Sequence, residues 1–125
     1  MLVHETGLGQ RLIGLGIEVH RALGPGLLES VYEECLCHEL KTSKIEFARQ
    51  VPLAVSYKGI KLDCGYRMDI VVASEVLVEV KSVDRLLPIH DAQVVTYLKL
   101  SGLKAGLLMN FNSVLLKDGL RRLVL

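Results

Sequence analysis

Hydrophobic residues near the start of the chain recur with the period of an α-helix. They stand three or four positions apart at Leu8, Leu12, Leu15, Val19 and Leu23, and Ile13 and Ile17 widen the stripe. Gly24-Pro25-Gly26 interrupts this pattern, because glycine and proline together end helices. The pattern therefore predicts a first helix that ends near Leu23 and a second from about Leu27 to Lys41. A polar, irregular segment is expected over residues 41–50.

The middle of the chain alternates with the period of a β-strand. Apolar side chains fall on every second residue at Val51, Leu53, Val55 and Tyr57, and again at Ile60, Leu62, Cys64 and Tyr66. Lys58-Gly59 between these runs predicts a two-residue turn, and Pro52 indicates a sheet edge or a strand end. The β-rich runs 70–72 and 76–80, joined by the polar break 73–75, predict a second hairpin.

The last third of the chain predicts one more helix and one buried strand. The helix spans about Ile89 to Leu100 and ends before Gly102, and the nearly continuous apolar run 104–111 is typical of a strand covered on both faces. Residues 114–125 contain a turn signal at 117–119 and are expected to form a short closing hairpin or edge piece. The order of elements predicts an α/β domain with a mixed sheet.

Composition narrows the class of protein. The length of 125 residues suits a single domain over 1–125, and 50% hydrophobic against 23% charged residues supports a packed core. The net charge of +1 gives no overall basic field for nucleic acid. Residues 1–11 lack the features of a secretory signal, and no apolar run reaches the roughly 20 residues of a membrane helix. We expect a cytoplasmic protein that does not enter the membrane.

The three cysteines fit neither a disulfide framework nor a zinc motif. Cys35 and Cys37 are two apart on a predicted helix and Cys64 is distant in sequence. They are expected to be buried or half-buried thiols in a reducing compartment.

Three charged residues interrupt the apolar strands around the second hairpin. Glu79 and Lys81 are two apart on a strand, so their side chains point to the same face, and the short turn brings Asp69 near them. Two carboxylates on an apolar sheet are costly unless they are paired or bind a ligand, and Mg²⁺ favours such oxygens. A surface ion pair accounts for these residues equally well when they are taken alone. Asp63 and Asp69 are an even number of residues apart, so a regular strand would place both on one face. A bend or bulge at Gly65 would change that.

Asp69 followed by Glu79-Val80-Lys81 resembles the metal-binding signature of the PD-(D/E)XK nuclease superfamily. Residues 26–32 (GLLESVY) resemble the signature of the GxxExxY family, a small branch of that superfamily. Gln93 and Tyr97 resemble the QxxxY helix that follows the ExK strand. Four motifs in the expected order cover nearly the whole chain. The resemblance implies the superfamily's αβββαβ core, with a mixed sheet flanked by helices.

The resemblance also implies a metal site for Mg²⁺ or Mn²⁺. Asp69 and Glu79 would hold the ion, the Val80 carbonyl oxygen would be a third protein ligand, and Glu29 would bind through water. Lys81 would orient the attacking water and help to deprotonate it.

Two further groups have supporting roles on this interpretation. Gln93 and Tyr97 would hold the phosphate or the metal ligands, and Tyr32 would buttress Glu29.

A purely structural interpretation stands beside each of these roles. Glu29 in a first helical turn suits the helix dipole, and Tyr32 suits a core aromatic with a hydrogen-bonded hydroxyl. On the same interpretation, the role of Lys81 is to offset the negative charge of Asp69 and Glu79. Polar residues are otherwise expected on solvated surfaces: the stripe His90, Gln93 and Tyr97, the glutamates Glu33, Glu34 and Glu39, and His20 near the end of its helix.

The sequence thus predicts a metal-dependent nuclease that hydrolyses phosphodiester bonds in nucleic acid, with DNA preferred. A nuclease fold that serves as a binding or assembly module, catalytically silent or dependent on a partner, is the alternative, and the neutral charge and scarce aromatics favour it. Hydrolysis of a small phosphoester is a third option. A homodimer is expected, because two sites related by a dyad could address both strands of a duplex, with residues 114–125 as part of the contact.

Overall fold

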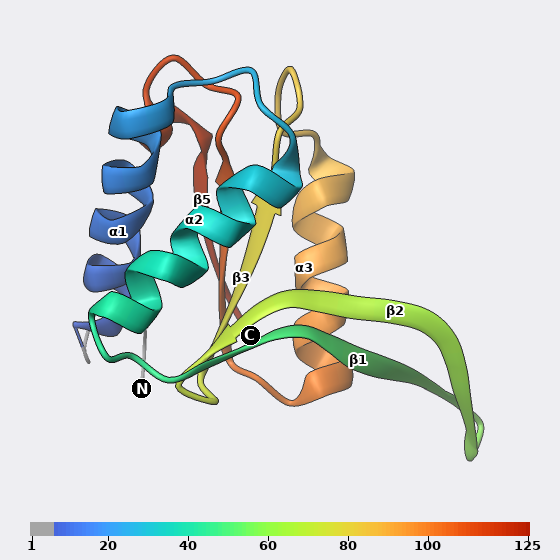
Figure 1. Ribbon diagram of the computed structural model, residues 1–125. Helices are drawn as coiled ribbons and strands as arrows, with labels where there is room; N and C mark the ends of the chain where they lie inside the picture. Colours follow the sequence, from blue (N-terminus) through green and yellow to red (C-terminus); the bar gives the residue numbers. More distant parts are fainter. Residues whose placement is uncertain (1–6) are drawn as a thin grey trace.

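The computed structural model describes residues 7–125 (Figure 1). Residues 1–6, part of the stretch considered above for a secretory signal, lie outside the described residues. The elements are α1 (Leu8–Leu23), α2 (Glu29–Thr42), β1 (Phe47–Tyr57), β2 (Ile60–Val72), β3 (Val76–Lys81), α3 (Pro88–Ser101), β4 (Ala105–Asn110), a 3₁₀ helix (Leu116–Gly119) and β5 (Leu120–Val124). The predicted helices and hairpins are confirmed, and the run from α2 to β4 has the expected αβββαβ order.

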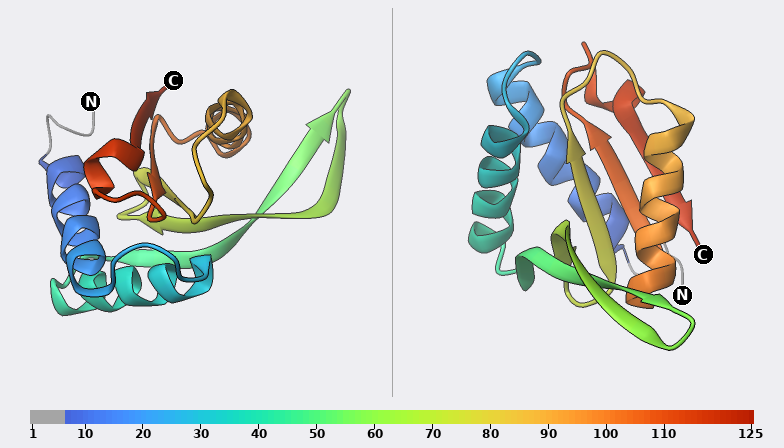
Figure 2. Two further views of the ribbon diagram at one scale, coloured as in Figure 1. Left: turned by 90° about the horizontal axis from the view of Figure 1, so that it is seen from above. Right: turned by 90° about the vertical axis from the view of Figure 1, so that its right-hand side faces the viewer.

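One five-stranded sheet in the order β1-β2-β3-β4-β5 forms the middle layer. β3 and β4 pair in parallel and the other neighbours are antiparallel, so the sheet is mixed as predicted. Helices α1 and α2 cover one face and α3 covers the other (Figure 2). Pro52 lies within β1, which is an edge strand, and β5 forms the opposite edge. The α/β class with a mixed sheet between helices is confirmed.

Strand β3 shows how the alternating pattern fills both layers. Val76, Val78 and Val80 point into the core beneath α1 and α2, whereas Leu77 joins the core beneath α3. Glu79 and Lys81 continue the Leu77 row, so both side chains point to the α3 side of the sheet. The expectation that Glu79 and Lys81 project together is therefore confirmed.

Gly106 in β4 lets α3 approach the sheet closely. A Cβ atom at this position would lie 2.9 Å from Cγ1 of Val94, closer than packed atoms normally come. Val94 and Leu98 are fully buried against the sheet at this contact. The close approach holds the polar side of α3 beside the end of β3.

The hairpin of β1 and β2 extends beyond the sheet as a curved arm, residues 55–67 (Figure 1). The pairing register shifts between Leu53 and Val55, opposite the stretch of β2 that contains Gly65 at φ 77°. The expected irregularity at Gly65 is thus present. It separates the exposed Asp63 on the arm from the half-buried Asp69 within the sheet.

Several surface predictions were wrong. Residues 41–50 are mostly regular, because α2 continues to Thr42 and β1 begins at Phe47. Cys64 is exposed on the arm rather than half-buried, because the arm has no covering layer. His20 is buried, and its Nε2 lies 2.7 Å from the carbonyl oxygen of Ser113, which satisfies the ring inside the protein.

None of the helices within residues 7–125 is both long enough and apolar enough to cross a membrane.

Candidate active site

The site forms where β2 separates from β3. The ladder between these strands covers only the residues from Ile70, opposite Val78, to Val72. Beyond it, side chains take over the connection: Glu79 Oε2 accepts a hydrogen bond from the Asp69 backbone N–H at 2.7 Å, and Asp69 Oδ2 accepts one from the Val80 N–H at 2.9 Å. Each carboxylate is therefore fixed to the strand that carries the other.

Burial makes this carboxylate pair electrostatically unfavourable. Glu79 is only 3% exposed. Burial, with the Asp69 charge as the second cause, raises the pKa of Glu79 to about 8. Burial also raises the pKa of Asp69 above its ordinary value, against the lowering effect of the Val80 N–H. The ion pairs among residues 7–125 join Arg49 to Glu33 and Glu34 and Arg121 to Asp91, so neither Asp69 nor Glu79 has one.

Lys81 begins a chain of hydrogen bonds that runs to α3. Its Nζ donates to Gln93 Oε1 at 3.1 Å, and Gln93 Nε2 donates to the Tyr97 hydroxyl at 3.3 Å. The Lys81 charge lowers the pKa of both carboxyls, though less than burial raises them. Burial and then the Glu79 charge raise the pKa of Tyr97. Lys81, Gln93 and Tyr97 thus lie together beside the pair, as the sequence predicted.

The polar stripe of α3 is not a simple solvent face. Tyr97 is buried and Gln93 is half-buried. His90 has a structural role, because its Nδ1 accepts a hydrogen bond from the Leu87 N–H and so caps the helix next to Pro88. Gln93, which bonds to Lys81, and Tyr97, which bonds to Gln93, are the two residues of the QxxxY pattern.

Tyr32 holds the loop between α1 and α2. Its hydroxyl donates to the Gly24 carbonyl oxygen at 2.6 Å and accepts from the Leu27 N–H at 3.1 Å. Its ring stacks on Phe111 with centroids 4.6 Å apart. These are the contacts of a core aromatic with a hydrogen-bonded hydroxyl. They help to position Glu29 only by fixing the backbone that precedes it.

Glu29 lies at the end of β3 rather than within the carboxylate pair. It is exposed, and its Oε2 accepts a hydrogen bond from the Ser82 N–H at 3.1 Å. The Ser82 hydroxyl donates to the Leu27 carbonyl oxygen at 2.6 Å, which ties the same loop to the same strand end. Across residues 7–125, no three His, Cys, Asp or Glu side chains gather as a ready set of metal ligands. Asp69 and Glu79 come together and Glu29 stands apart.

Sequence reasoning missed Glu33. It was assigned to a solvated face, but it is 7% exposed and forms a salt bridge with Arg49 at 2.9 Å. Gln50 Nε2 donates to both Glu33 oxygens and, at 3.4 Å, to Asp69 Oδ1. The network therefore connects α2 to Asp69 through β1. Its sequence signal was the position of Glu33 one helical turn after Glu29 and next to Tyr32.

Asn110 was also missed. It is 2% exposed at the end of β4, where its Oδ1 accepts from the N–H of Val83 and its Nδ2 donates to the Val83 carbonyl oxygen. These bonds hold the chain just after Lys81. The signal was a single amide at the end of an otherwise apolar strand.

The donor set suits a divalent cation. The buried Glu79 and the half-buried Asp69 are adjacent and have no ion pair among residues 7–125, so a bound cation would offset their repulsion and restore their ordinary ionisation. Carboxylate and carbonyl oxygens are the ligands that Mg²⁺ and Mn²⁺ prefer. The residues present therefore fit the ion that the sequence predicted.

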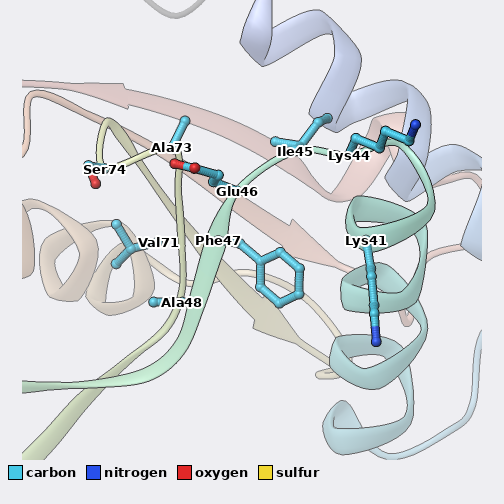
Figure 3. Close-up of a pocket in the computed structure, with 9 residues that line it drawn as sticks. All are labelled: Lys41, Lys44, Ile45, Glu46, Phe47, Ala48, Val71, Ala73 and Ser74. Carbon is cyan, nitrogen blue, oxygen red and sulfur yellow. The ribbon is translucent and has the colours of Figure 1, made fainter.

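Two hollows lie on the surface near these elements. A groove of about 580 Å³ runs beside Lys81 between α3 and the arm. The other, about 740 Å³, lies between the end of α2 and the start of β1 and includes none of the predicted site residues. In Figure 3 its two lysines, Lys41 and Lys44, point away from each other and so do not converge on a ligand.

Comparison with known proteins gave one match. A sequence model described as the PD-(D/E)XK nuclease superfamily matches residues 6–123, which is nearly the whole chain. The match does not single out the GxxExxY branch. No curated protein matches the chain, and neither does any solved structure.

The raised pKa of Glu79 predicts how stability changes with pH in the absence of metal. Its pKa is about 8 in the folded protein against 4.5 ordinarily, so folding favours the protonated form. This contribution is complete below pH 4.5 and is lost as the pH rises toward 8. Urea unfolding in EDTA should show the parent losing on the order of a few kcal/mol between pH 5 and pH 8 relative to Glu79→Gln.

Asp63→Asn is the matched control, because it removes an exposed carboxylate from the arm. It should keep the parent's change in unfolding free energy between the two pH values. A parent and a Glu79→Gln variant with equal pH dependence would show that Glu79 does not titrate in this range.

Proposed function

Because the chain belongs to the PD-(D/E)XK nuclease superfamily, we propose that it is a metal-dependent nuclease that hydrolyses phosphodiester bonds in DNA. The observation that carries the proposal is the pair of the half-buried Asp69 and the buried Glu79, which are hydrogen-bonded across two diverging strands and have no ion pair within residues 7–125. Lys81 lies beside this pair with its ammonium held by Gln93. A structural salt-bridge cluster would instead use Lys81 to pair with a carboxylate.

The chain's own residues divide the work as follows. Asp69 and Glu79 would hold Mg²⁺ or Mn²⁺, the Val80 carbonyl oxygen would be a further ligand, and Glu29 would act through water. When bound, the cation lowers the pKa of a water molecule and neutralises charge on the phosphate. Lys81 orients the attacking water and helps to remove its proton.

The residues around the pair keep it in position. Gln93 holds Lys81 and is itself hydrogen-bonded to Tyr97, and both side chains would contact the phosphate. Gln50 and Glu33 fix the orientation of Asp69. Removing the Gln93 amide would take away the hydrogen bond that holds the Lys81 ammonium, which is costly because catalysis depends on geometry.

The wider assignment completes the proposal. Residues 26–32 match the GxxExxY signature, and we place the chain in that branch as one nuclease-like domain over residues 1–125 acting in the cytoplasm. Incubation of the purified protein and Mn²⁺ with single-stranded, duplex and branched DNA and RNA tests the activity.

A binding or assembly module with the same fold is the second candidate. The arm favours it, because Tyr57, Ile60 and Leu62 are large apolar residues exposed on a protruding hairpin. Absence of cleavage by the folded, Mn²⁺-loaded protein on every nucleic acid of that panel would favour this candidate.

Metal binding should stabilise the fold. If Asp69 and Glu79 are the ligands, Mn²⁺ at ~100 times its dissociation constant adds about 2.7 kcal/mol to the free energy of unfolding. Asp69→Asn combined with Glu79→Gln should remove this gain. Urea unfolding with and without Mn²⁺ measures it.

The matched double variant Asp63→Asn with Glu75→Gln removes two exposed carboxylates and should keep the gain. A metal-induced gain of equal size in the site variant would place the ion elsewhere.

Lys81→Met separates a catalytic lysine from a purely electrostatic one. Loss of the ammonium leaves the two carboxylates without its charge, and saturating Mn²⁺ should restore the stability. Turnover should not recover, because a general acid or base contributes ~10²–10⁴-fold to rate. We expect cleavage at least ~100-fold slower than the parent, measured under saturating metal.

Lys99→Met removes one charge from an exposed position of α3 and should cleave at the parent's rate. Cleavage at the parent's rate by folded, metal-loaded Lys81→Met would exclude Lys81 from the mechanism.

A symmetric dimer is part of the proposal. β5 is an edge strand, and apolar side chains are exposed along residues 114–125, including Val114 at 86%. Light scattering at tens of micromolar should give twice the chain mass of 13.8 kDa. Val124→Arg on β5 should give the monomer mass, whereas Ile60→Arg on the arm, which is equally exposed, should not. A monomeric parent would contradict the dimer.

A further inference from the structure

The groove between the arm and α3 has Lys81, the lysine beside the carboxylate pair, in its wall. Its walls are mainly apolar and come from both elements, with Val55 and Tyr66 on one side and Ile89 and Leu100 on the other. Lys81, Gln93 and Tyr97 also line it. A ligand in this groove would therefore touch the same lysine that lies beside Asp69 and Glu79.

The volume of the groove suits a small organic group rather than the surface of a partner protein. About 580 Å³ falls within the ~300–1,000 Å³ typical of small-molecule sites. Its lining divides into a few polar side chains, among them Lys81 and Gln93, and a larger part that is hydrocarbon and aromatic. A ligand that is charged at one end and flat and apolar at the other would match this division.

Two tyrosines give the groove an aromatic wall. The rings of Tyr66 and Tyr97 pack edge to face, with centroids 6.2 Å apart and planes at 63°. Tyr97 is buried, whereas Tyr66 is 48% exposed and so has ring surface left for a ligand. An exposed aromatic beside a phosphate-cleaving site is suited to stacking on a base.

The apolar wall continues outward along the arm. Val55 pairs with Leu62 and Tyr57 pairs with Ile60, and opposite residues of an antiparallel pair share a face. The arm also carries Lys58, Lys61 and Arg67 against a single acidic residue, Asp63. Apolar surface with a basic excess complements a polyanion whose bases are exposed.

We propose that this groove binds an unpaired base of single-stranded DNA, stacked on Tyr66, next to the phosphate to be cleaved. The inference rests on the proposed nuclease function and specifies its substrate. Bases within a duplex stack on each other and offer no free face, so a duplex would not use the aromatic wall. DNA suits the groove better than RNA, since a hydrocarbon wall provides few partners for a 2′-hydroxyl.

Binding measured without metal tests the groove separately from catalysis. Fluorescence anisotropy in EDTA compares an oligothymidine, an abasic oligonucleotide of equal length and a duplex. The oligothymidine should bind at least about tenfold tighter than the other two. Tyr66→Ala should weaken oligothymidine binding by about 5- to 150-fold, the range of one base stacked on an aromatic ring, and leave abasic binding unchanged.

Matched variants control for folding and for the loss of an exposed side chain. Tyr66→Phe keeps the ring and should bind like the parent. Leu23→Ala removes an exposed large apolar side chain from α1 that does not line the groove, and it should also bind like the parent. Circular dichroism melts of all three variants verify the fold.

Equal affinity for abasic and thymidine oligonucleotides, tighter binding of the duplex or of an oligouridine, or an equal loss in Leu23→Ala would overturn the proposal. Each of these results is independent of cleavage, so an active nuclease without base-dependent binding refutes the groove alone. Base-dependent binding without cleavage on any substrate supports the groove and refutes the nuclease.

Discussion

The candidate site depends on the point where β2 leaves β3. The ladder between these strands ends at Ile70 and Val78, so it supplies no carbonyl acceptor for the backbone N–H groups of Asp69 and Val80. Here Glu79 and Asp69 supply the acceptors instead, at 2.7 and 2.9 Å. This exchange pulls two carboxylates into the protein and holds them side by side. It also releases the arm, which then forms one wall of the groove beside Lys81.

Holding two carboxylates in a buried position has a cost that appears in their ionisation. Burial and mutual repulsion raise the pKa of Glu79 to about 8, so the metal-free site carries less negative charge than two ordinary carboxylates would. The protein could have offset this cost with an ion pair, as it does for Glu33 with Arg49. The arrangement instead leaves Lys81 bonded to an amide and the two carboxylates without an ion pair among residues 7–125, which favours the proposed cation site over a structural cluster.

Much of the supporting structure was predictable because strands and helices have fixed periods. The shared face of Glu79 and Lys81, the αβββαβ order and the buried strand 104–111 follow from patterns within short windows. Glu33 shows the limit of this reasoning. Its position on α2 indicates only a helix face, and nothing local shows that Arg49 and Gln50 lie against that face. Glu29 and Tyr32 share a motif, yet Glu29 is exposed at a strand end and Tyr32 is a buried loop support.

The sequence by itself determined the α/β class, the two hairpins and the superfamily. It also determined which side chains are candidates for the site: Asp69, Glu79, Lys81, Gln93 and Tyr97. These follow from residue types at set spacings, which backbone periodicity translates into shared faces. Only the tertiary structure decided that Asp69 and Glu79 hydrogen-bond across a split in the sheet, that Glu33 is buried and that the arm and α3 enclose a groove. The reason is physical: each of these features depends on which distant segments pack together, and burial, electrostatic repulsion and enclosure arise only from that packing.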